Sequence, residues 1–170
     1  MQIVGLNSVH VGEPLPKGVS DSGADALIKA FKKIQQPYKG GVQLNFAVPS
    51  KNEFYREGED SPFYSEYDAT TATKEVTWSV ADWDDETLEF YFGTTEPEQG
   101  KMYEGEKAFA FDGNSGGTMV FARLKYVAVP SGAFNSIDPL VANVTATVLA
   151  PAEGGRAWKP IVTPTYTEEE

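Results

Sequence analysis

Cysteine is absent from this 170-residue chain, and histidine occurs only once, as His10. Without cysteine the chain can form neither a disulfide framework nor a cysteine-ligated zinc site. One imidazole cannot build a histidine-rich metal site, and a Ser-His-Asp triad would have to use His10. The nucleophile elbow, the Walker loop and the dinucleotide-binding fingerprint are missing as well. These absences predict a protein that is not an enzyme and needs no cofactor and no metal.

Long apolar runs are also missing. No stretch approaches the roughly 20 residues that a membrane-spanning helix needs. Residues 1–7 lack the basic start and the apolar core of a secretory signal. We therefore expect a soluble protein that is made in the cytoplasm and binds no membrane.

Positive charge is scarce, because 25 acidic residues outnumber 14 basic ones and the formal net charge is −11. Such a field repels phosphate backbones, so sequence-specific nucleic-acid binding is not expected. The charge is also uneven, since residues 82–106 carry nine acidic side chains and one lysine. A basic region is formed by Lys29, Lys32, Lys33 and Lys39. Opposite patches of this kind allow head-to-tail self-association, and the alternative is that both are simply solvated faces.

Residues 22–35 give the clearest helical pattern. Apolar side chains recur on one face at helical spacing, and lysines take the opposite face. Ser22 is placed to cap this helix, with Asp25 three residues further on. The pattern predicts an amphipathic helix that covers a sheet. Its basic face is a candidate contact between subunits and consists of Lys29, Lys32 and Lys33.

The rest of the chain is dominated by strand patterns. Strands are predicted over residues 42–48, 76–80, 107–111, 118–129 and 140–150, and apolar and polar residues alternate in the first, second and last of these. Several strands without a βαβ succession indicate a mainly β fold, an antiparallel sandwich or barrel with helical cover. No linker divides the chain, so we predict a single domain over residues 1–170.

Two further segments complete this prediction. Asp82 or Asp84 is placed to cap a short helix that Gly93 terminates. Residues 151–170 form an extended, proline-spaced arm that ends in three glutamates. We expect this arm to be frayed unless a partner holds it.

Residues 50–73 are polar, acidic and aromatic, and they lack a sustained period. A segment of this length inside a compact domain needs an explanation, and a long hairpin ordered by a neighbouring subunit would provide one. Aromatic side chains in an acidic background are typical of an interface rather than a free surface. The candidate contact residues are Phe54, Tyr55, Phe63, Tyr64 and Tyr67.

Carboxylates and tryptophans are the remaining candidates for chemistry. Two carboxylates suffice for glycoside hydrolysis, but neither residues 57–60 nor residues 82–86 lie in a frame that makes two carboxyls face each other. The second cluster is better explained by helix capping. Trp78, Trp83 and Trp158 would suit a carbohydrate platform, although Trp78 lies on the apolar face of a strand and is expected in the core.

Three blocks of the sequence carry a family resemblance: IVGLNSVHVGE at residues 3–13, EFYREGEDSP at 53–62 and VTWSVADWDDETL at 76–88. In order and spacing they resemble the tail-tube proteins of tailed bacteriophages and prophages. The features shared are an opening strand with a Val-Gly-Glu turn, a Glu-Phe-Tyr-x-Glu-x-x-Asp-x-Pro stretch and an Asp-x-Asp-x-x-Thr-Leu helix start. The resemblance covers roughly the first half of the chain, and none of its blocks is catalytic.

The resemblance implies a β-sandwich flanked by a helix, which assembles into hexameric rings that stack into a tube for DNA passage. The implied partners are copies of the same chain, a tape-measure protein and an initiator. The implied location is the bacterial cytoplasm during assembly and then the virion tail. Two alternatives stay open. One is another tail or head-tail joining protein on the same fold, and the other is a non-catalytic β-sandwich module that binds carbohydrate or protein.

Overall fold

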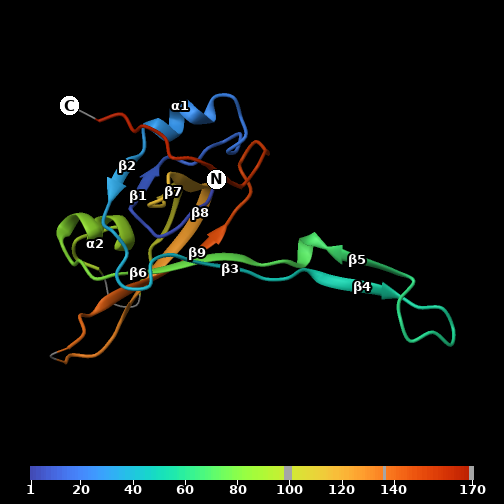
Figure 1. Ribbon diagram of the computed structural model, residues 1–170. Helices are drawn as coiled ribbons and strands as arrows, with labels where there is room; N and C mark the ends of the chain where they lie inside the picture. Colours follow the sequence, from blue (N-terminus) through green and yellow to red (C-terminus); the bar gives the residue numbers. More distant parts are fainter. Residues whose placement is uncertain (98–100, 136, 169–170) are drawn as a thin grey trace.

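The computed structural model describes residues 1–97, 101–135 and 137–168. The mainly β prediction is confirmed, because within these residues ten antiparallel strands contain 40% of the chain and two helices about a tenth. Neither described helix exceeds eight residues, which is too short to cross a membrane. Figure 1 shows a body of strands and helices from which one long hairpin projects.

One continuous sheet forms the body. Its strands follow the order β2-β1-β7-β8-β9-β6-β3, and β10 pairs with β8 beside this path. The long strand β8 has β7 along one edge, whereas β10 and β9 share the other edge. The bounds are β1 (Ser8–Gly12), β2 (Lys32–Ile34), β3 (Gln43–Phe46), β6 (Lys74–Val80), β7 (Glu104–Asp112), β8 (Gly117–Ser131), β9 (Val141–Val148) and β10 (Trp158–Val162).

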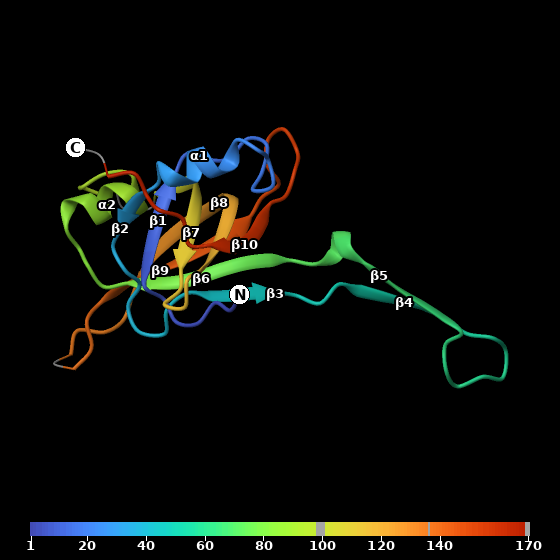
Figure 2. The same cartoon turned by 45° about the horizontal axis from the view of Figure 1, so that its top comes forward.

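The main core lies inside the curl of this sheet. Strands from both ends of the order contribute to it, including β1 with Val9 and β6 with Trp78, and Phe109 of β7 lies fully buried between them. Figures 1 and 2 show β6 and β3 crossing under β1, β7 and β8. As expected, Trp78 is a core residue and not part of a surface platform.

Helix α2 (Asp85–Phe92) packs against this core. Asp84 is its N-cap, because its Oδ1 accepts a hydrogen bond of 2.8 Å from the Thr87 amide, and Gly93 ends it at a φ of 74°. Both features were predicted from the sequence. The Tyr91 hydroxyl accepts a hydrogen bond of 3.0 Å from Trp78 Nε1, and burial raises the pKa of Tyr91 to about 12.

A second core lies on the opposite face of the sheet. Small alanines of β7 and β8 let the N-terminal region and α1 (Ala24–Lys29) approach closely. Its members are Leu15, Val19, Ala24, Ile28, Phe31, Ala108, Ala110, Val120 and Ala122. The pairing of β7 with β8 contains a register shift. Phe109 lies opposite Phe121 and Lys107 opposite Leu124, so two steps along β7 correspond to three steps along β8. The extra residue in β8 therefore lets Phe121 and Leu124 both reach the main core.

The helix predicted over residues 22–35 is wrong in extent. The structure ends α1 at Lys29, and residues 32–34 form the edge strand β2, paired with β1. The helix begins after Gly23, without a side-chain cap from Ser22. Pairing with β1 is favoured because it places Ile34 against the main core while Phe31 enters the second core.

The C-terminal arm differs from the prediction as well. Residues 158–162 form β10 on β8, and residues 163–168 lie against β1 and α1. The described part of the arm is therefore held by its own chain. Glu169 and Glu170, the end of the predicted frayed tail, lie outside the described residues.

Candidate interaction surface on a projecting ribbon

Residues 50–68 form a two-stranded ribbon that leaves the body of the protein. Among the described strands, β4 (Ser50–Phe54) and β5 (Tyr64–Asp68) pair with each other and with no other strand. Every side chain from residue 50 to residue 70 is exposed. Figures 1 and 2 show this ribbon continuing the direction of β3 and β6, far beyond either helix.

The base of the ribbon is attached firmly to the sheet. The Ala47 amide donates to the Thr73 carbonyl at 2.9 Å, and the Ser50 amide donates to Thr71 Oγ1 at 2.7 Å. Asp68 caps the short 3₁₀ turn Ala69–Thr71, because its Oδ1 accepts from the Thr70 hydroxyl at 2.6 Å and from the Thr70 amide at 3.0 Å. These two bonds, the hydroxyl one first, hold the pKa of Asp68 below its usual value. The hydrogen bonds of Ala47 and Ser50 join the base of the ribbon to the strands β3 and β6 of the sheet.

Aromatic side chains occupy both faces of the ribbon. Phe54 lies opposite Tyr64, and their ring centroids are 5.7 Å apart. Tyr67 lies opposite Lys51, whose ammonium group is 5.8 Å from the centre of the Tyr67 ring. Residues 51 and 54 are an odd number of positions apart, so these two pairs point to opposite faces.

The turn of the ribbon adds a further aromatic contact. The Arg56 guanidinium lies 5.0 Å from the centre of the Phe63 ring, a cation–π geometry. The five aromatic residues expected at an interface remain 46% to 58% exposed even with these neighbours. The structure thus brings all five together on one element.

Charge on the ribbon is mainly negative, with six acidic and two basic side chains in residues 50–68. Lys51 Nζ lies 2.8 Å from Glu53 Oε1, and the hydrogen bond from Lys51 lowers the pKa of Glu53. The Tyr55 hydroxyl donates to the same carboxylate, which raises the pKa of Tyr55. These contacts order the side chains in solvent without burying them.

The lysines predicted as a second contact surface do not form one helix face. Lys29 is exposed at the end of α1, whereas Lys32 and Lys33 lie on β2 opposite Val11 and His10. Because side chains alternate along a strand, these two lysines point to opposite faces of the sheet. Lysines on an edge strand also discourage pairing with another strand, which is a structural reason for their presence.

Two apolar features escaped the sequence prediction. The loop between β8 and β9 exposes 96% of Phe134 and 85% of Ile137. Beside it lies a cavity of about 700 Å³, walled in part by Trp83 and Leu140, where Trp83 Nε1 donates to the Leu140 carbonyl at 3.0 Å. The large apolar side chains of Phe134 and Ile137, in a loop without strand or helix periodicity, were the available signal in the sequence.

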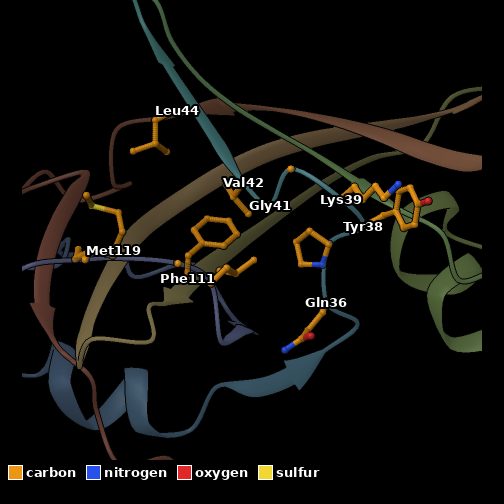
Figure 3. Close-up of a pocket in the computed structure, with 13 residues that line it drawn as sticks. Gln36, Tyr38, Lys39, Gly41, Val42, Leu44, Phe111 and Met119 are labelled. Carbon is orange, nitrogen blue, oxygen red and sulfur yellow. The ribbon is translucent and has the colours of Figure 1, made fainter.

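The other feature is a groove of about 700 Å³ beside β3 (Figure 3). Val42, just before β3, and Leu44 of β3 line one side of the groove. Phe111 of β7 and Met119 of β8 also line it. Strand β3 ends the sheet order and pairs only with β6. The groove therefore opens where the curl of the sheet is not closed by another strand.

Tryptophans and acidic residues were the remaining candidates for chemistry in the part of the chain that the structure describes. Within these residues no group of three histidine or carboxylate side chains is placed to hold a metal ion. The three tryptophans differ in exposure: Trp78 is buried, Trp158 is half-buried and packs edge-on against Phe46, and Trp83 is 39% exposed. No protein-family model and no curated protein matches this chain, so the tail-tube resemblance rests on the three sequence blocks.

Proposed function

We propose that this protein is a non-catalytic structural subunit that assembles with copies of itself, as a tail-tube protein of a tailed bacteriophage or prophage. The ribbon is the observation that supports this proposal most directly. An isolated two-stranded ribbon is only marginally stable in water. No other part of the described chain covers its aromatic residues, and neighbouring subunits cover them in the assembly.

The two-sided distribution of the aromatic residues restricts how such a contact forms. A flat partner surface covers the Phe54–Tyr64 face or the Tyr67 face, but not both. A ribbon inserted into a cleft, or between two copies, has both faces covered. We therefore favour assemblies in which each ribbon reaches across to more than one neighbour.

The two edge strands of the sheet are the second observation that supports the proposal. The order of strands ends at β2, with its two lysines, and at β3, which borders the apolar groove. Pairing of β3 with a neighbouring copy closes the groove and removes the exposed edge. Rings formed in this way, hexameric in the tail-tube case, stack into a tube. Their net negative charge repels DNA phosphates and lets DNA pass.

Within this proposal the protein is located in the bacterial cytoplasm before assembly and in the virion tail afterwards. A tape-measure protein and an initiator are the further partners. A head-tail joining role on the same fold shares these features. A binding module is the alternative from another class, and the cavity beside Trp83 with its exposed Phe134 favours it. That alternative predicts a monomer at all concentrations.

Sedimentation velocity over a concentration series, followed by negative-stain imaging of any large species, tests the proposal. The tail-tube proposal predicts rings, or tubes that lengthen with protein concentration. Large species of irregular shape would argue against a tube, and a monomer at every concentration would favour the binding module.

A further inference from the structure

A buried carboxylate anchors the C-terminal segment of the chain. Asp112, at the end of β7, is 1% exposed. Its Oδ1 accepts hydrogen bonds of 2.7 Å from the Thr118 hydroxyl and from the Tyr166 hydroxyl. Its Oδ2 accepts from the Ser8 hydroxyl at 2.9 Å and lies 2.9 Å from His10 Nδ1. Three parts of the chain that are far apart in sequence therefore meet at one side chain.

Residues 163–168, which we call the strap, lie over this carboxylate. The Tyr166 ring stacks on the His10 ring with 3.6 Å between centroids and 5° between planes. The Thr163 amide donates to the Gly116 carbonyl at 2.9 Å, and the Thr167 amide donates to the Lys29 carbonyl at 2.7 Å. Figure 2 shows this red segment running from β10 past β1 and α1. The strap thus joins the sheet to the end of α1.

Few contacts hold the strap compared with the sheet beneath it. Its side chains are half-buried or exposed, whereas Ala110 and Val120 under it are fully buried. Segments with few buried contacts open locally at much lower free energy than core strands do. The strap is therefore expected to open at a lower free energy than the sheet strands β7 and β8 beneath it.

We propose that the strap is an acid-sensitive latch: protonation of His10 beneath Tyr166 releases residues 163–168 from the sheet and from α1. The inference does not depend on the proposed tail function. The charged groups that face His10 are Asp112 from β7 and Lys33 from β2, and the strap presents the neutral Tyr166 hydroxyl. Lys29 is the exposed basic residue at the end of α1.

The effects of these groups on the pKa of His10 determine whether acid opens or closes the strap. Burial is the largest influence and, with Lys33, holds the pKa of His10 below its ordinary value of 6.5, although Asp112 acts the other way. Lifting the strap returns water to His10 but leaves Asp112 beside it, so the pKa of His10 rises. The open form therefore binds the proton more tightly, and acid favours opening. The closed strap is most favoured above the pKa that His10 has in the open form, and it weakens as the pH falls from there towards the lower pKa of His10 in the closed form.

Opening has a defined structural consequence. The strap is the only segment in the described chain that gives α1 a backbone hydrogen bond at Lys29 from outside the helix. The helix is six residues long and has no side-chain N-cap. Releasing the strap therefore loosens α1 and uncovers the part of the second core against which Tyr166 packs, without disturbing the main core.

Amide hydrogen exchange measured by NMR between pH 7.5 and pH 5.0, corrected for intrinsic exchange, tests this latch. We expect the opening constants at Thr163 and Thr167 to rise as the pH falls below 6.5, by at most about tenfold per pH unit for one proton. The amides of β6 and β7 should stay protected throughout. Constant protection of Thr167 over this range would overturn the proposal.

Two variants sharpen the test. His10→Phe keeps a ring for stacking but cannot be protonated, so its strap should open to the same extent at every pH; an unchanged pH dependence would overturn the proposal. Tyr166→Ala removes the cover, so the pKa of His10, read from its ring protons in the otherwise intact protein, should rise above the wild-type value. An identical His10 pKa in the two proteins would also overturn it. This second measurement does not require His10→Phe to fold.

Discussion

Phe109 in the body and Phe54 in the ribbon share two local features but differ in burial. Each lies on or at the end of an antiparallel strand, and each has an aromatic neighbour, Trp78 at 5.4 Å and Tyr64 at 5.7 Å. Yet Phe109 is 0% exposed and Phe54 is 46% exposed. Both regions therefore consist of paired strands. Within the described residues, only in the body are the aromatic side chains covered by other elements of the chain. The comparison indicates that the body supplies stability and the ribbon supplies contacts.

The largest effect is expected in the body. Phe109→Ala removes a fully buried ring that contacts Trp78, Phe90 and Tyr126. We expect a loss of about 3–5 kcal/mol in the free energy of unfolding, because a cavity remains where the ring was. Urea unfolding followed by tryptophan fluorescence measures this loss. A loss under about 1 kcal/mol would contradict the assignment of the main core.

A smaller effect is expected where α2 is fastened to the sheet. The buried Tyr126 hydroxyl donates a hydrogen bond of 3.0 Å to the Phe90 carbonyl. Tyr126→Phe should lower the free energy of unfolding by about 1 kcal/mol, since the carbonyl loses its partner. Tyr67→Phe on the ribbon is the matched control and should leave urea unfolding unchanged. Equal losses in the free energy of unfolding for the two variants would contradict the assignment of stability to the body and not to the ribbon.

The smallest effect on stability is expected in the ribbon. Phe54→Ala, the same change as in the first prediction, should alter the free energy of unfolding by no more than about 0.5 kcal/mol. It should nevertheless weaken self-association, which sedimentation velocity detects. A destabilisation comparable to that of Phe109→Ala would mean that the ribbon belongs to the folding core.

Sequence patterns predicted the parts of the fold where local and tertiary preferences agree. Residues 76–80 alternate cleanly because one side of β6 is buried, and Asp84 and Gly93 bound α2 by local hydrogen bonding and backbone geometry. The aromatic and acidic character of residues 50–73 indicated a surface for contacts. It is this segment that the structure extends as the ribbon.

The errors arose where distant contacts decide the structure. The spacing of Phe31 and Ile34 suits a helix, but the two residues enter different cores, which a turn and a strand achieve. Simple alternation places Phe121 and Leu124 on opposite faces, and only pairing with β7 reveals the extra residue between them. The arm was expected to fray because no local pattern shows that Tyr166 reaches Asp112, 54 residues earlier in the chain.

The ribbon's role in assembly is tested most directly by comparing the wild type with Phe54→Ser/Tyr67→Ser, which removes one aromatic residue from each ribbon face. Size exclusion with light scattering over a concentration series gives the mass of each species, and urea unfolding checks that both proteins are folded. We predict that the wild type forms large assemblies and that the double variant stays monomeric with an unchanged unfolding midpoint. Assembly of the double variant equal to that of the wild type, or a wild type that is monomeric at every concentration, would contradict the account.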